Sequence, residues 1–493
     1  MLIWVIKISK FYITTPIYYA NDKLHIGHAN TNVIADVLAR WHRLIGDDVF
    51  FLTGSDEHGE KIEKAAKEAG ISNIELVNEE VKKFKELWLK LNISNDYFIR
   101  TTEKKHEDSV KLFIEIMNKN NDIYKSKYSG WYCIYEETFW TKLELKNGKC
   151  PECGREVKIV EEDAYFFRLS KYQEKLLEFY KKNNFVTPKY RQHEMFNRIN
   201  NGLKDISITR PSVRWAVEFP IDEKQFVYVW IDALINYLSA LDWPDGTNFK
   251  QFWPPDVHVI GKDINWFHSV IWPSLLMSCN LALPSNILVT GWWTINNEKM
   301  SKSKGNVIDP ISLIDKYSAD ALRYFLIKEK PVGDDGNFSE DALIARINGE
   351  LVADLGNLIY RVLSLAKKSG DMEFKGTNAL DKKLEFEKLK NAMQNLDITL
   401  GLNIIWQFIR ETNRYVNENK AWALQGPELS NVLYNLLEAC RIIAILIYPF
   451  MPETGQKIAN QLGTDINFNK CKFSDGAFNG IIKEAEYLFK KIN

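Results

Sequence analysis

The chain has 493 residues, of which 45% are hydrophobic, so it can bury large cores, and its length predicts about two to four domains rather than a disordered protein. Its 64 basic and 65 acidic residues leave a formal net charge of -1, which excludes a uniformly basic nucleic-acid-binding protein. Any contact with RNA must therefore be made by a local patch.

The first motif lies between a predicted strand and a predicted helix. Leu2 to Ile13 is apolar and rich in β-branched and aromatic residues, which predicts a strand, and Pro16, Asn21 and Asp22 are expected to break it. Apolar residues at helical spacing from Val33 to Trp41 predict a helix, so the tetrapeptide His25–His28 lies at the junction. A helix N-terminus attracts anions, and two imidazoles near it can donate hydrogen bonds to one phosphate. On the tetrapeptide alone, two surface histidines at a helix start are an equally good interpretation.

A second strand and helix follow. Asp48 to Thr53 is a buried-strand pattern, the polar stretch Gly54–Gly59 comes next, and a helix is predicted from about Glu60 to Ala69. This alternation predicts a doubly wound, Rossmann-like parallel sheet. Ligands of such sheets bind beyond the carboxyl ends of the strands, where His25–His28 and Asp56–His58 are both expected.

The later parts of the chain change in character. Residues 119–225 lack long periodicity and are interpreted as an insertion between two halves of the sheet domain. Three further strands are predicted at Phe226–Leu234, Val257–Asp263 and Ile287–Gly291, and a helical bundle is predicted from the patterns at Leu351–Val362, Leu402–Val416 and Leu429–Ile447. No segment of membrane-spanning length and no signal cleavage site are expected, so we predict a cytoplasmic protein.

A second motif, Lys299–Asn306, reads Lys-Met-Ser-Lys-Ser-Lys-Gly-Asn. Mobile lysines and hydroxyl groups beside a glycine suit a flexible clamp on a polyphosphate. Alone, such a stretch is more often a solvated basic loop. Together with His25–His28, this stretch is better explained as a phosphate-binding loop than as a chance basic loop.

These residues resemble a known family. His25–His28 and Lys299–Ser303 match the two signature sequences of class I aminoacyl-tRNA synthetases. The chain resembles methionyl-tRNA synthetases specifically, over essentially its whole length, through the further segments Thr14–Tyr19, Thr53–Gly59, Tyr228–Leu234 and Ile260–Ile264. The expected organisation is a Rossmann-like catalytic domain in two halves (1–118 and 226–285), a connective insertion (119–225) with a zinc-knuckle-like segment at about 130–155, a stem-contact region (286–345) that carries the lysine and serine loop, and an α-helical anticodon-binding domain (346–493).

The resemblance implies that the protein activates L-methionine with ATP, accompanied by Mg²⁺, to methionyl-adenylate and transfers it to the 3' end of tRNA(Met). Positioning and charge stabilisation should dominate such a reaction. The implied catalytic residues are His25, His28, Lys299 and Lys302, and the implied ATP-binding set adds Gly27, Met300, Ser301 and Ser303.

The resemblance also implies a methionine pocket. An acidic residue and backbone would hold the amine, and an aromatic, apolar shell would select the polarizable thioether. The implied residues are Ile17, Tyr19, Asp56, Trp230, Ala233, Leu234, Tyr237, His268 and Trp272. Without the resemblance, Trp230 and Trp272 would be interpreted as plain core residues. Some members of the family have a proline at the position of Leu234.

Three of the six cysteines cluster, and the others lie in scattered apolar contexts, which indicates a reduced protein with one possible metal site. In the family, two Cys-x-x-Cys or Cys-x-x-His pairs bind a structural Zn²⁺. Here Cys150 and Cys153 form one pair, but the other pair has only Cys133, with Glu136 in the place of the missing ligand. A zinc site with these four ligands is expected, and a relic knuckle held by packing is the alternative.

In the helical region the resemblance implies that Asn357, Arg361 and Trp422 read the anticodon. Asn357 and Arg361 are one helical turn apart, and an exposed tryptophan can stack on an unpaired base. Ala421 replaces the proline that usually precedes this tryptophan. Without the resemblance, Asn357 and Arg361 would be an ordinary polar helix face.

Two alternative functions remain, one a different enzyme and the other a protein without enzymatic activity. A synthetase for leucine, isoleucine or valine would resemble longer chains with a large editing insertion, and residues 119–225 are too few for that insertion. A non-enzymatic tRNA-binding paralogue would have no physical need for two phosphate clamps. The expected partners are therefore methionine, ATP and tRNA(Met), with no membrane, and the expected state is a monomer.

Overall fold

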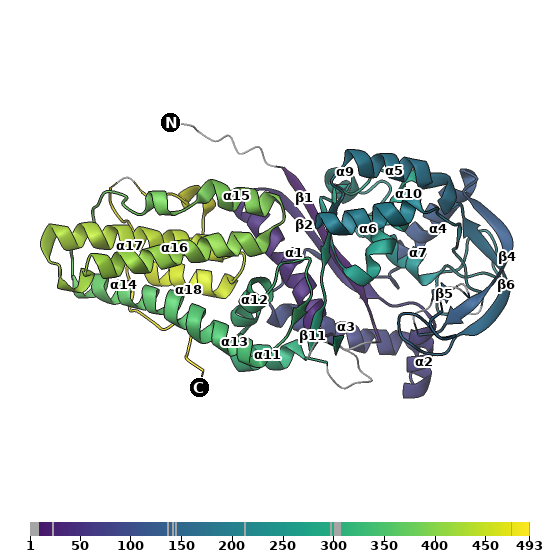
Figure 1. Ribbon diagram of the computed structural model, residues 1–493, viewed down its shortest axis with the longest axis horizontal. Coiled ribbons are helices and arrows are strands. Elements are labelled where there is room, and N and C mark those ends of the chain that lie inside the picture. The colour runs from purple at the N-terminus through teal and green to yellow at the C-terminus, as the bar shows by residue number, and fades with distance from the viewer. Residues whose placement is uncertain are drawn as a thin grey trace.

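A parallel sheet lies in the middle of the molecule, with an antiparallel insertion at one end and a bundle of helices at the other (Figure 1). The computed structural model describes residues 9–21, 24–135, 138–140, 142, 145–211, 213–295, 298–299, 307–474 and 476–492. The predicted fold class, a doubly wound α/β domain with an insertion and a C-terminal helical bundle, is confirmed.

Within the described residues, six parallel strands form the central sheet in the order β3-β2-β1-β9-β10-β7. They are β1 (Lys10–Tyr19), β2 (Asp48–Asp56), β3 (Tyr97–Arg100), β7 (Val186–Thr187), β9 (Val257–Gly261) and β10 (Asn286–Thr290). The chain winds outward in one direction from β1 and in the other from β9. The connections therefore separate at the carboxyl ends of these two strands, which is where such sheets bind ligands.

Helices connect the strands of this sheet. They are α1 (Ile26–Ile45), α2 (Glu60–Ala69), α3 (Asn73–Lys90), α4 (Lys104–Lys119), α9 (Thr247–Phe252) and α10 (Trp272–Ser278). Helix α1 packs on β1, β2 and β9, and its buried residues Val33, Val37 and Trp41 confirm the predicted apolar stripe. The first residue of α1 follows His25, so the first motif lies at the edge of the sheet.

The expected break at Pro16 is wrong, whereas the strand does end just before Asn21; the predicted strand residues 2–8 lie outside the described residues. Strand β1 continues to Tyr19, but its register with β2 shifts between Thr14 and Ile17. A proline has no N–H to give to a sheet ladder, and an irregularity of this kind is where a strand can accommodate it.

The strand predicted at Phe226–Leu234 is also wrong. Val227 makes only an isolated bridge to Thr209, and Val229–Leu234 is the helix α7, followed by α8 (Asn236–Ser239). A short apolar run buried on all sides has no period that separates a strand from a helix, so tertiary packing decided between them.

The insertion contains a second, antiparallel sheet in the order β5-β4-β6-β8. Its strands are β4 (Ile123–Cys133), β5 (Thr138–Trp140), β6 (Lys158–Phe167) and β8 (Ile206–Ser207), and its helices are α5 (Gln173–Lys182) and α6 (Lys189–Asn200). The long β4 and β6 ribbon forms one end of the molecule (Figure 1). Strand β7, between α5 and α6, returns to the central sheet and pairs with β10.

A small sheet and a set of helices complete the chain. The strands are β11 (Trp293–Ile295), β12 (Glu298–Lys299) and β13 (Gly336–Asn337), and the helices are α11 (Pro310–Tyr317), α12 (Ala319–Lys328), α13 (Glu340–Arg346), a π-helix (Ile347–Gly356), α14 (Asn357–Lys368), α15 (Phe386–Gln394), α16 (Ile398–Glu418), α17 (Gly426–Ile447) and α18 (Pro452–Leu462). The predicted C-terminal helices are confirmed. By length and composition α17 would suffice to cross a membrane, contrary to expectation, but 94% of its most apolar window is buried, as in a core helix.

Candidate active site

His25 and His28 together cap the N-terminus of α1. The Gly27 N–H donates to His25 Nδ1 at 3.0 Å, and the His25 N–H donates to His28 Nδ1 at 3.0 Å. The two rings stack with centroids 3.9 Å apart. Because each Nδ1 accepts a hydrogen bond, the proton of each neutral ring is on Nε2. The motif thus closes the helix end and places two imidazole rings at the N-terminus of α1.

A cavity of about 320 Å³ lies beside this helix start. Its walls come from the carboxyl ends of β1, β2, β9 and β10 and from α7 and α8. Of the predicted site residues, the walls include Ile17, Tyr19, His25, Gly27, His28, Asp56, Trp230, Ala233, Leu234, Tyr237 and His268. Folding therefore brings three of the residues expected to hold ATP, His25, Gly27 and His28, to one cavity with most of those expected to hold methionine.

Asp56 supplies a carboxylate to this cavity from the last position of β2. It is aligned with Tyr19 in the parallel ladder and is only 7% exposed. The Ala20 N–H donates to the Asp56 carbonyl at 2.9 Å, which holds the ends of β1 and β2 together. A buried carboxylate of this kind is suited to a cationic group such as an ammonium.

The part of the cavity wall formed by Tyr237 and His268 is uncharged. Tyr237 Oη lies 2.8 Å from His268 Nε2, and His268 Nδ1 lies 3.1 Å from the Ile264 carbonyl. Since a carbonyl only accepts, the His268 proton is on Nδ1 and the Tyr237 hydroxyl donates to Nε2. Burial lowers the pKa of His268 to about 4, so this histidine is uncharged at neutral pH. Trp230 stacks on Phe267 with centroids 3.9 Å apart and extends the aromatic wall.

Helix α7, which carries Trp230 and Ala233, is attached to the sheet domain by a buried carboxylate. Asp232 Oδ2 lies 2.8 Å from His58 Nδ1, and Asp232 Oδ1 lies 2.8 Å from His106 Nε2. Burial opposes the charge on Asp232, but His58 and His106 outweigh it and hold the pKa of this carboxyl below its usual range. The arrangement fixes the aromatic wall relative to the end of β2.

Trp272 does not line the cavity, in contrast to the expectation. Its side chain is fully buried, and its Nε1–H donates to His258 Nε2 at 3.3 Å. Its ring centroid lies 6.0 Å from that of Tyr237. Trp272 therefore supports the wall from behind.

Several residues of the cavity wall were not predicted. They are Pro16, Tyr18, Thr31, Asn236, Gly261, Asp263, Ile264, Thr290, Gly291, Trp292 and Trp293. Asp263 and Thr290 lie just beyond β9 and at the end of β10. A search for polar residues at the carboxyl ends of the predicted strands would have found these two. Asn236 lies just beyond Phe226–Leu234, which is predicted to be a strand, so the same search would also have found it, although this segment ends in a helix.

Lys299, the first residue of the predicted lysine and serine loop, belongs to a pair of strands that begins at the cavity wall. Trp293 lines the cavity and begins β11, and β11 pairs with β12, in which Lys299 is aligned with Thr294. The side chain of Lys299 and the residues Met300, Ser301, Lys302 and Ser303 lie outside the described residues.

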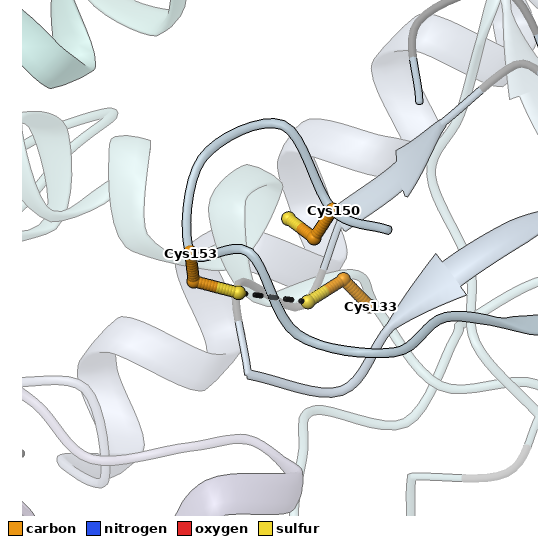
Figure 2. A group of neighbouring side chains, drawn as sticks. All are labelled: Cys133, Cys150 and Cys153. Atoms are coloured by element: carbon orange, nitrogen blue, oxygen red, sulfur yellow. Dashed lines mark hydrogen bonds between the residues drawn. The ribbon is translucent and has the colours of Figure 1, made fainter. Parts of the chain in front are cut away.

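The three clustered cysteines face one another (Figure 2). Their sulfur atoms lie within 4.8 Å of one another, and those of Cys133 and Cys153 are 3.5 Å apart. Thiolates bound about 2.3 Å from a tetrahedral zinc lie about 3.8 Å apart, so this spacing fits a zinc ion. Glu136, the predicted fourth ligand, lies outside the described residues.

The predicted anticodon residues lie at one end of the helical bundle. Arg361 on α14 donates to Asn417 Oδ1 at 3.0 Å and to Asn413 Oδ1 at 3.1 Å on α16. Asn357, one turn earlier, is exposed. Trp422 is 57% exposed, which is unusual for a tryptophan.

Comparisons with known proteins support one family. The family described as tRNA synthetases class I (M) matches residues 11–159 and 141–363. Methionine–tRNA ligases of Caldanaerobacter subterraneus subsp. tengcongensis and Thermotoga maritima are each 44% identical over 98% of this chain, and over 79% and 80% of their own lengths.

Solved structures agree with this assignment. The Mycobacterium tuberculosis methionyl-tRNA synthetase in complex with methionyl-adenylate is 36% identical, with a TM-score of 0.93 over 98% of this chain and 100% of that one. The apo form of the same enzyme is 33% identical and gives a TM-score of 0.87 over 99% of both chains. The chain is thus more similar to the adenylate complex than to the free form, and it belongs to the methionine–tRNA ligase family of class I tRNA synthetases.

Proposed function

We propose that this protein is a methionine–tRNA ligase. It joins L-methionine and ATP to methionyl-adenylate with release of pyrophosphate, and then transfers the methionyl group to the 3' end of tRNA(Met). The observation that carries the proposal is the single cavity in which Asp56, the neutral aromatic wall and the histidines that cap α1 meet. Family membership supports the same activity.

The cavity suits each part of methionine. The Asp56 carboxylate and the backbone at Ile17 hold the amine, and the neutral wall at Trp230, Tyr237 and His268 receives the uncharged thioether. A charged histidine at this position would disfavour an apolar side chain. The low pKa of His268 removes this conflict at neutral pH.

The histidine cap of α1 suits the phosphate groups of ATP. A methionine carboxylate oxygen attacks the α-phosphorus, the bond to the bridging oxygen breaks, and pyrophosphate leaves with the electron pair. The Nε2–H groups of His25 and His28 and the N-terminus of α1 stabilise the charge on the phosphates. Lys299, Met300, Ser301, Lys302 and Ser303 remain the predicted clamp on the leaving group. When bound with ATP, Mg²⁺ supplies additional positive charge there.

Exchange of labelled pyrophosphate into ATP tests this function. Methionine should support exchange, whereas leucine, isoleucine and valine at the same concentration should not. Better exchange with one of these three amino acids would indicate a synthetase of that specificity. Absence of exchange with every amino acid would favour a non-enzymatic tRNA-binding protein.

We also propose that the cysteine cluster binds one structural Zn²⁺ through Cys133, Cys150 and Cys153, with Glu136 as the predicted fourth ligand. Elemental analysis of the purified protein should find about one zinc per chain. Cys150→Ser should lose most of the metal, whereas Cys279→Ser, outside the cluster, should keep it. Wild-type protein without metal would identify the segment as a relic knuckle held by packing.

The remaining assignments are proposals of the same kind. We propose that residues 346–493 bind the anticodon, that residues 286–345 contact the stem, and that residues 119–225 form the connective insertion. The exposed Trp422 and the position of Asn357 and Arg361 on one helix support the first of these. The monomeric state and the cytoplasmic location remain predictions.

A further inference from the structure

Strand β11, which leads to the lysine and serine loop, is paired on both sides. It is antiparallel to β12, which ends with Lys299, and parallel to β13, with Trp293 aligned to Gly336. Strand β13 lies in the connection from α12 to α13. The position of the β11–β12 hairpin therefore depends on how this connection is held.

Backbone hydrogen bonds join this connection to the residues just before β11. The Gly291 N–H donates to the Val332 carbonyl at 3.0 Å, and the Gly336 N–H donates to the Trp292 carbonyl at 2.9 Å. A Cβ at Gly291 would lie only 2.0 Å from the carbonyl oxygen of Asp334, so only glycine allows this approach. Residues 291–293, which form the root of the β11–β12 hairpin, therefore cannot move without moving the connection.

Asp335 joins this root to the cavity wall. Its carboxylate accepts from Lys262 Nζ at 2.8 and 2.6 Å, and its Oδ1 accepts the Trp292 N–H at 2.8 Å. Lys262 directly follows β9, and its ammonium lies 3.9 Å from the ring centroid of Trp292. The Trp292 indole N–H donates to Asp263, a residue of the cavity wall, at 3.4 Å.

We propose that Asp335 and Lys262 are positioning residues that set the β11–β12 hairpin against the end of β9, and with it the clamp on departing pyrophosphate. The inference rests on the proposed function. The Asp335 side chain is 46% exposed, and ion pairs this exposed contribute about 1 kcal/mol or less to stability. Loss of the pair should therefore affect the reaction and leave the fold unchanged. Neither residue lines the methionine wall.

The test is methionine-dependent exchange of pyrophosphate into ATP by Asp335→Asn, Lys262→Met and the double variant. Each single variant should lower kcat about tenfold and raise the KM for ATP, because misplacement of a positioned group costs rate. The KM for methionine and the melting temperature should not change. The double variant should be no slower than either single variant, since both substitutions break one interaction. Asp335→Glu should restore most of the rate.

Asp315→Asn is the matched control, because Asp315 on α11 forms a similar exposed pair with Lys90 on α3, with the two charged atoms 2.6 Å apart, and neither residue belongs to the hairpin. This variant should behave as wild type. Three results would each overturn the inference. The losses of kcat in the two single variants could multiply in the double variant, the loss of kcat could be confined to Lys262→Met, or the KM for methionine could rise as much as the KM for ATP. Wild-type protein without exchange would overturn the proposed function as well, so the two failures are distinguishable.

Discussion

Asp56→Asn should raise the KM for methionine about a hundredfold and leave the KM for ATP nearly unchanged. The carboxylate is 7% exposed and lines the cavity, so its interaction with the substrate ammonium is desolvated. Removing one partner of such a charged pair costs about 2–5 kcal/mol, and the change to asparagine keeps the volume of the side chain. Initial rates of pyrophosphate exchange over a range of methionine and ATP concentrations measure both constants.

Two controls separate recognition of the amine from a general defect. Asp48→Asn, at the opposite end of the same strand, should leave both constants unchanged. The thioether acid that lacks the amino group should compete equally weakly with methionine for wild type and for Asp56→Asn. If the variant weakened methionine and the amine-free acid to the same degree, Asp56 would not be the partner of the amine.

Arg323→Met should lower the free energy of unfolding by about 3–5 kcal/mol, because it leaves a buried carboxylate without its main partner. Arg323 Nη2 lies 2.7 Å from Asp36 Oδ2, and both side chains are fully buried. The guanidinium also donates to the carbonyls of Leu91, Pro449 and Phe450 at 3.1, 2.9 and 2.8 Å. The substitution therefore loosens the contact between the sheet domain and the helical bundle.

Urea unfolding followed by circular dichroism measures this loss. Lys104→Met, which breaks an exposed pair with Asp108, should cost less than about 1 kcal/mol. The double variant Asp36→Asn with Arg323→Met should regain part of the loss, since the buried charge that has lost Arg323 is then absent. A loss below about 1 kcal/mol for Arg323→Met would show that the buried pair contributes no net stability.

The ion pair of Asp36 with Arg323 also predicts how the free energy of unfolding depends on pH. Burial opposes the charge on Asp36, but Arg323 and Arg40 outweigh it and lower the pKa of this carboxyl in the folded state. The stability that Asp36 contributes is therefore present above its ordinary pKa of about 3.9 and is lost as the pH falls through the lowered value. The difference between wild type and Arg323→Met should narrow below about pH 4.

The amino-acid sequence determined those features that depend on neighbours along the chain. His25 and His28 are three residues apart, so they cap one helix wherever that helix packs. The alternation of strands and helices up to residue 119 and the long amphipathic helices of the C-terminal region have periods that can be recognised without a partner. The cysteine cluster was predicted for a similar reason, because Cys150 and Cys153 are close in the chain.

Tertiary structure alone decided the features that depend on contacts between distant segments. The segment Val229–Leu234 is mostly buried, and its apolar residues suit a buried strand and a buried helix equally well, so only packing made it a helix. Trp272 lies behind the cavity wall, although the family resemblance implied a place on it. The contacts of Asp335 with Lys262 and of Arg323 with Asp36 follow no sequence period, since each pair meets only when separate elements pack. The sequence therefore indicated which residues could bind ATP and methionine, and folding determined which of them share the cavity.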